Sequence, residues 1–142
     1  MPARRPVWSP HLSKDINSIE DVQKFALRIC AKSWEDPYED LLHLFNLPSM
    51  SERRLHLDLC TMFKIVHGYF YFPSGIVSEL QSCRITCNTG RPHLLHRPFA
   101  HSSYFYHSFV PRTVYSWNNL PTYLTSCETV SSLKYYLVTY FN

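Results

Sequence analysis

The sequence predicts a mainly α-helical fold, a small helical domain with an irregular or short β-hairpin insertion between the third and last helices. Apolar residues recur at helical spacing in four separate stretches. Only three glycines stand against ten prolines, which favours helices and stiff connectors over a turn-rich sandwich. Hydrophobic residues make up 45% of the chain and aromatic residues 15%, enough to build a packed core. We expect one domain over residues 1–142.

The first helix is marked by a single apolar stripe. The residues of this stripe are Ile19, Val22, Phe25, Ala26, Ile29 and Cys30. Ser18 followed by Asp21 resembles a capping box, and an earlier start near Leu12 also fits the pattern. On the opposite face, Lys24, Arg28 and Lys32 follow one another at four-residue spacing and form a basic ridge. The sequence therefore predicts a helix with one apolar and one basic side.

Two further helices have clear start signals. Asp36 is placed to cap a short helix, with Pro37 at its first position, and this helix must end before Pro48. Ser49 and Glu52 repeat the capping pattern in front of a longer helix. Its predicted buried stripe consists of Leu55, Leu59, Met62, Phe63 and Val66, and Gly68 offers a left-handed stop. We expect residues 7–68 to form the first helical part.

The helical period disappears over residues 69–111. Two short strands are predicted there, RITCN at 84–88 and SYFYHSFV at 103–110. In the following part, residues 112–142, Val114 and Trp117 are three residues apart and are expected to be buried together in a helical turn. Asn118 or Asn119 is expected to end that turn before Pro121.

A last helix is predicted from Glu128 to Phe141, with Ser126 as its cap. The residues expected to share one face of it are Val130, Leu133, Leu137 and Tyr140.

The net charge of +3 is unevenly distributed. Residues 1–82 hold nine Lys/Arg and ten Asp/Glu, whereas residues 83–142 hold five Lys/Arg and one acid, Glu128. A basic, aromatic and acid-poor half tolerates polyanions. The candidate phosphate-contacting residues are Lys24, Arg28, Lys32, Arg53, Arg54 and Arg112. The alternative is that these charges lie on ordinary solvated helix faces.

Catalytic and metal chemistry find little support. Cys83, Cys87, His93 and His96 offer four zinc ligands, but only five residues separate the two pairs, so free thiols and surface histidines are the ordinary interpretation. We expect no cofactor and no small-molecule substrate. The segment Tyr38-Glu39-Asp40 superficially resembles a polymerase aspartate box, but it lacks adjacent aspartates and begins a helix.

The odd number of cysteines and the start MPARRPVWSP, which has no apolar core, predict an intracellular protein of the nucleus or cytoplasm. The longest uncharged stretches contain Pro, Gly or His, so we expect no membrane span.

Four blocks in order resemble one family. They are VWSP at 7–10, DINSIEDVQ at 15–23, LPSMSERRLHLDLCTMFKIVHG at 47–68 and FVPRTVYSWNNLP at 109–121, followed by Leu133-Lys134. Together they resemble the C-terminal thumb and post-thumb region of non-LTR, LINE-type retrotransposon reverse transcriptases, with jockey-like elements nearest. The segment TCNTGRPH at 86–93 departs from the T-R-G-H that relatives often carry.

The resemblance implies a noncatalytic region that follows the polymerase's aspartates and helps to hold the RNA or DNA template–primer. The upstream polymerase domain of the parent polyprotein is the expected protein partner. An alternative is a helical packing module that binds no nucleic acid. An exposed apolar patch on the first helix or at residues 69–77, together with scattered basic residues, would favour that alternative.

Overall fold

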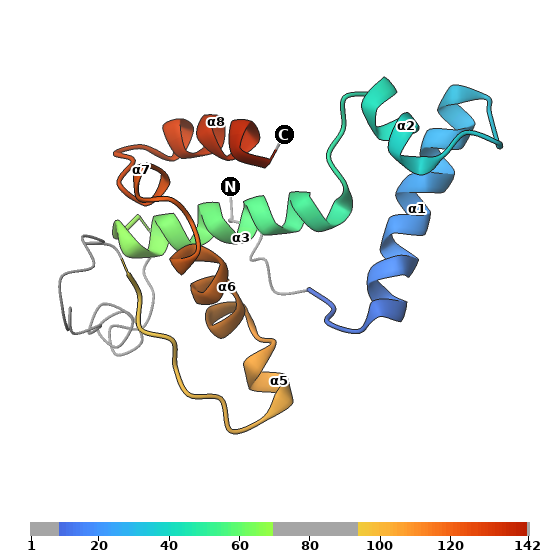
Figure 1. Cartoon of the computed structure of the whole chain (residues 1–142). Helices are drawn as coiled ribbons and strands as arrows, with labels where there is room; N and C mark the ends of the chain where they lie inside the picture. The colour runs from blue at the N-terminus through green and yellow to red at the C-terminus, as the bar shows by residue number, and fades with distance from the viewer. Residues whose placement is uncertain (1–8, 70–93, 142) are drawn as a thin grey trace. The chain divides into compact units, whose positions relative to one another are not determined.

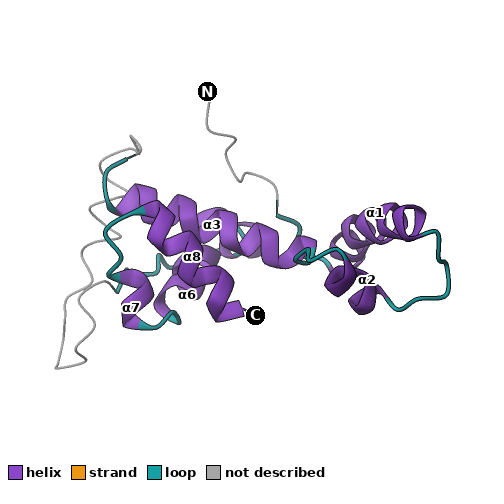
Figure 2. Ribbon diagram, turned by 90° about the horizontal axis from the view of Figure 1, so that it is seen from above, coloured by secondary structure: helices purple, strands orange, loops and turns teal. Residues whose placement is uncertain are grey.

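Every regular element in the described chain is an α-helix (Figure 2). The computed structural model describes residues 9–69 and 94–141. The chain divides into two compact units, an N-terminal unit over Trp8–Leu55 and a C-terminal unit from His56 onward. Within the described ranges no helix is long and apolar enough to cross a bilayer. The prediction of a mainly helical fold is confirmed.

In the N-terminal unit, α1 (Ser13–Ala31) lies beside α2 (Tyr38–Leu44), as Figure 1 shows. The earlier start of α1 is the observed one, because Leu12 is the N-cap residue and the Ser18 hydroxyl donates to the Lys14 carbonyl instead of capping. Pro37 precedes α2, and no side chain caps this helix, so the predicted Asp36 cap is not formed.

The start and the end of α3 (Met50–Val66) follow the predicted capping pattern. The Ser49 N–H donates to the Glu52 carboxylate at 3.0 Å, and the Glu52 N–H donates to the Ser49 hydroxyl at 3.2 Å. Gly68 has φ +71°, and its neighbour Tyr69 donates its N–H to the Lys64 carbonyl. The predicted Ser49–Glu52 capping pattern and the predicted helix stop at Gly68 are therefore confirmed.

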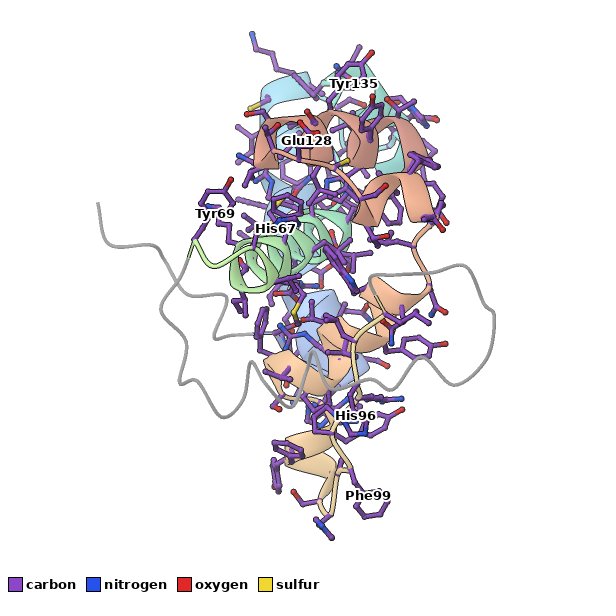
Figure 3. All side chains as sticks on the ribbon, turned by 90° about the vertical axis from the view of Figure 1, so that its left-hand side faces the viewer. His67, Tyr69, His96, Phe99, Glu128 and Tyr135 are labelled. Atoms are coloured by element: carbon purple, nitrogen blue, oxygen red, sulfur yellow. The ribbon has the colours of Figure 1, made fainter. Side chains whose placement is uncertain are left out.

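The C-terminal unit is built around α3. In Figures 1 and 3, α8 (Val130–Phe141) lies on one side of α3 and α6 (Phe109–Asn118) on the other. This position explains the buried residues of α3 beyond His56. Its buried residues are Asp58, Leu59, Cys60, Met62, Phe63 and Ile65. They meet Trp117 of α6, which is fully buried with Val114, as the sequence predicted.

The strand predicted for SYFYHSFV is wrong. Residues 94–102 are irregular, α5 (Ser103–Tyr106) follows, and Phe109 already belongs to α6. Ser102 explains the helical turn because its hydroxyl accepts the Phe105 N–H at 3.2 Å. Pro111 is tolerated in the first turn of α6, where its missing N–H leaves no bond unmade. The other predicted strand, RITCN, lies outside the described residues.

The last helix forms with a different cap from the predicted one. The Thr129 hydroxyl accepts the Ser132 N–H at 3.2 Å, whereas Ser126 donates its hydroxyl to the Thr122 carbonyl and closes α7 (Thr122–Thr125). Leu133 and Leu137 are buried as predicted, while Tyr140 is exposed. Thr129 lies one residue before α8, directly in the N-cap position.

Candidate functional site

The basic ridge of α1 lies on the half-buried side of the helix. Lys24 and Arg28 are half-buried, and the Arg28 Nε is buried with no hydrogen-bond partner among the described residues. Lys32 is exposed and adopts a left-handed conformation with φ 54° just after the helix. Of the ridge residues, only Lys32 therefore presents its charge fully to solvent.

The two arginines at the start of α3 differ from each other. Arg53 is exposed, whereas Arg54 is half-buried and donates from Nη2 to the Ser51 hydroxyl at 3.1 Å. The Arg54 Nη1 is buried and lacks a partner in the described chain. Arg53 is thus the more accessible of the two for a phosphate.

Arg112 has an internal role. Its Nε and Nη2 donate to one carboxylate oxygen of Asp58 at 3.0 and 2.8 Å, and its Nη1 donates to the His107 carbonyl at 3.2 Å. The Asp58 side chain is only 8% exposed. These bonds tie α6 to α3 and occupy the guanidinium. Sequence reasoning overlooked Asp58, although a lone acid in the apolar run LHLDLC was a signal that a cation must come from elsewhere.

The six candidate phosphate-contacting residues are divided between the two units. Arg112 belongs to the C-terminal unit, and the other five belong to the N-terminal unit. Among those five, Lys32 and Arg53 are exposed and the others are half-buried. Phosphate binding by this set stays a prediction.

Glu20 organises the N-terminal unit. Its carboxylate accepts the Tyr38 hydroxyl at 2.7 Å, the Met50 and Ser51 N–H groups at 3.1 and 2.8 Å, and the Ser51 hydroxyl at 2.9 Å. Partial burial alone would raise the pKa of Glu20, but these hydrogen bonds outweigh it and lower the pKa below the ordinary 4.5. Burial and the Glu20 carboxylate raise the pKa of Tyr38. One side chain thus joins α1, α2 and the start of α3.

This arrangement leaves the apolar stripe of α1 exposed to solvent. An amphipathic helix usually buries its stripe, yet Val22 is 70% exposed, Phe25 57% and Ile29 53%. The side of α1 that faces inward instead carries Glu20, Gln23 and Leu27, the last being the buried residue of the helix. The Gln23 amide donates to the Pro48 carbonyl at 3.0 Å. The polar contacts of Glu20 and Gln23 therefore decide which face of α1 is covered.

The exposed stripe continues into an apolar groove. The groove has a volume of about 610 Å³ within the N-terminal unit. Its principal apolar residues are Ile19, Val22, Ala26, Leu27, Leu47 and Met50. Arg53 and Asp15 also line it. Beside it, Phe25 packs edge-on against Trp34 with ring centroids 5.9 Å apart, and Trp34 is itself exposed. We call the stripe and groove together the α1 apolar face.

Within the described ranges, no group of three or more His, Cys, Asp or Glu residues is placed to hold a metal ion. Cys83, Cys87 and His93 lie outside those ranges, and His96 is exposed. Burial raises the pKa of the Cys60 and Cys127 thiols, which disfavours the reactive thiolate. Neither thiol is therefore suited to act as a nucleophile.

Comparison with known proteins adds no relative: no protein-family model, curated protein or solved structure matches the chain. The α1 apolar face is consequently judged on its own geometry.

Proposed function

We propose that this chain is a noncatalytic helical packing module that binds a protein surface through the α1 apolar face. The observation that carries the proposal is the exposure of Val22, Phe25 and Ile29 on the same helix face, next to a groove lined mainly by apolar side chains. Exposed contiguous apolar surface of this kind is typical of interaction sites. The half-burial of Lys24, Arg28 and Arg54 also favours protein packing over phosphate binding, as does the ion pair of Arg112 with Asp58.

The proposed partner is the polymerase domain of a non-LTR retrotransposon polyprotein. In the polyproteins that the chain resembles, this domain directly precedes the corresponding region. The catalytic aspartates belong to that partner, and the module contributes packing rather than chemistry.

The test is a titration of this chain with the separately purified polymerase domain of a jockey-like element. Biolayer interferometry measures the binding. Val22→Asp is the test variant, because it adds a charge at an exposed position and should change folding stability by less than about 0.5 kcal/mol. Burial of one valine contributes about 1.5 kcal/mol or more, so we expect Val22→Asp to weaken binding at least tenfold. Leu57→Asp is the matched control, since Leu57 is also exposed but belongs to the C-terminal unit.

Binding that is weakened by Val22→Asp and retained by Leu57→Asp supports the proposal. Absence of binding, or equal weakening by the two substitutions, contradicts it.

A further inference from the structure

The α1 apolar face is long and narrow. Its exposed residues follow one another along α1 at spacings of three and four residues, so they are neighbours on one side of the helix. They are Ser18, Val22, Phe25, Ala26 and Ile29. From Asp15, which lines the groove, to Ile29 the face extends over about four helical turns, which is roughly 21 Å along the axis of α1. A segment that covers this face must have a similar length.

The backbone of α1 offers no hydrogen-bond partners to such a segment. Between the two ends of an α-helix, the N–H and C=O groups bond to one another. An extended segment laid over Val22 and Ala26 would bury its own N–H and C=O groups without partners, which costs free energy. Extension of a sheet is no alternative within the described residues, because every regular element there is a helix. A helix brings its own backbone hydrogen bonds, so a helix suits this face best.

Two charged side chains line the groove together with the apolar residues. Asp15 comes from the first turn of α1 and Arg53 from the start of α3. Both residues are exposed. Among the described residues, neither side chain forms an ion pair or a hydrogen bond. A partner with an acid against Arg53 and a base against Asp15 complements both charges, whereas the reverse arrangement places like charges together.

We propose that the α1 apolar face receives an amphipathic α-helix of about four turns. Apolar residues of that helix at positions i, i+3, i+4 and i+7 pack against Val22, Ala26 and Ile29, and its flanking charges meet Arg53 and Asp15. The small side chains of Ser18 and Ala26 leave hollows beside Val22 and Ile29, into which the side chains of the partner helix fit. This inference rests on the proposed function and adds the kind of segment through which the partner docks.

The test uses two fluorescein-labelled peptides of eighteen residues with identical composition, and it measures anisotropy with the full chain as titrant. One peptide is a stapled helix that carries a leucine stripe at helical spacing, glutamates along one edge of the stripe and lysines along the other. The second peptide alternates apolar and polar residues, which favours an extended strand over a helix with an apolar face. We expect the chain to bind the helical peptide and not the alternating one. Val22→Asp should weaken binding of the helical peptide at least tenfold.

Reversal of a groove charge tests the charge complement. Arg53→Glu places an acid against the glutamates of the helical peptide and should weaken its binding about fivefold at low salt, with a smaller effect at high salt. Lys32→Glu is the matched control, because Lys32 is exposed, its replacement changes the net charge equally, and it does not line the groove. Asp15→Lys and its control Asp21→Lys form a second pair of the same design. Circular dichroism of each variant verifies the fold.

The titration with the polymerase domain separates this inference from the proposed function. If the domain binds through Val22 while the helical peptide binds no better than the alternating one, the docking helix is wrong and the proposed function stands. If the helical peptide binds through Val22 and the domain does not bind, the face takes a helix and the proposed partner is wrong. If neither binds, both proposals are wrong. Equal weakening by Arg53→Glu and Lys32→Glu would overturn the assigned charge complement.

Discussion

Arg112 and Asp58, which are 54 residues apart in the sequence, form a largely buried ion pair that fixes α6 against α3. Both the guanidinium Nε and Nη2 donate to the same carboxylate oxygen, and the His107 carbonyl accepts from Nη1. The aspartate is the more buried partner. Residues 112–121, RTVYSWNNLP, belong to the last block of the family resemblance. In this structure they form a packing segment, in which Val114 and Trp117 are buried and Arg112 anchors α6.

We predict that Arg112→Met destabilises the chain more than Asp58→Asn does. Loss of the arginine leaves a buried carboxylate without its cation and costs about 3 kcal/mol. Loss of the carboxylate leaves an arginine that water still reaches, since its side chain is 22% exposed. Urea unfolding followed by circular dichroism measures both free energies of unfolding.

The double variant Asp58→Leu with Arg112→Met removes both charges and should recover part of the lost stability. If Arg112→Met shifts stability by no more than an ordinary surface substitution, about 0.5 kcal/mol, the ion pair does not anchor α6.

A second prediction concerns Glu20 and pH. The folded-state pKa of Glu20 lies below its ordinary 4.5, so the carboxylate stabilises the fold fully above about pH 4.5. That stabilisation is lost as the pH falls through the folded-state pKa. Glu20→Gln should be less stable than the original chain by about 1 kcal/mol at pH 7, because an amide oxygen is a weaker acceptor than a carboxylate.

The difference in free energy of unfolding between the two proteins should shrink from pH 5 to pH 3. All other carboxyl groups are present in both proteins, so their contributions to the pH dependence cancel in this difference. A difference that stays constant over this range would show that the Glu20 charge does not hold α1 to α2 and α3.

A third prediction tests the Asn118 side chain. Its amide donates to the Leu95 carbonyl and its oxygen accepts the Leu95 N–H, so it pairs with the backbone as a neighbouring strand would. Asn118→Ala should cost about 1 to 2 kcal/mol and speed hydrogen exchange of the Leu95 amide. Asn118→Asp keeps the acceptor and should leave that amide better protected than alanine does.

Asn119→Ala is the control for this pair, since Asn119 is the exposed next residue and ends α6. Equal exchange rates at Leu95 in the Asn118→Ala and Asn119→Ala variants would contradict the assigned role.

Much of the helical structure is predictable because its signals are local. Ser49 and Glu52 lie three residues apart and meet at the start of α3 whatever surrounds them, and Gly68 ends the helix through its own backbone. The last helix follows from the spacing of Leu133 and Leu137. These elements need no knowledge of distant residues.

The remaining features depend on contacts between distant residues. The stripe pattern of α1 identifies its apolar face but not what covers it, and the bonds of Glu20 to Met50 and Ser51, 30 and 31 residues away, turn that face outward. The alternating aromatics of 103–110 suit a strand or a helix equally, and the Ser102 cap selects the helix. Pairings such as Asn118 with Leu95 have no local signature.

The most direct test of the proposed function is hydrogen–deuterium exchange of the chain with and without the polymerase domain. We predict added protection at residues 19–29 and 47–53, which carry the exposed stripe and the groove, and no change in α8. Protection confined to α5 or α8, or no change in any helix, would contradict the assignment of the α1 apolar face as the docking surface.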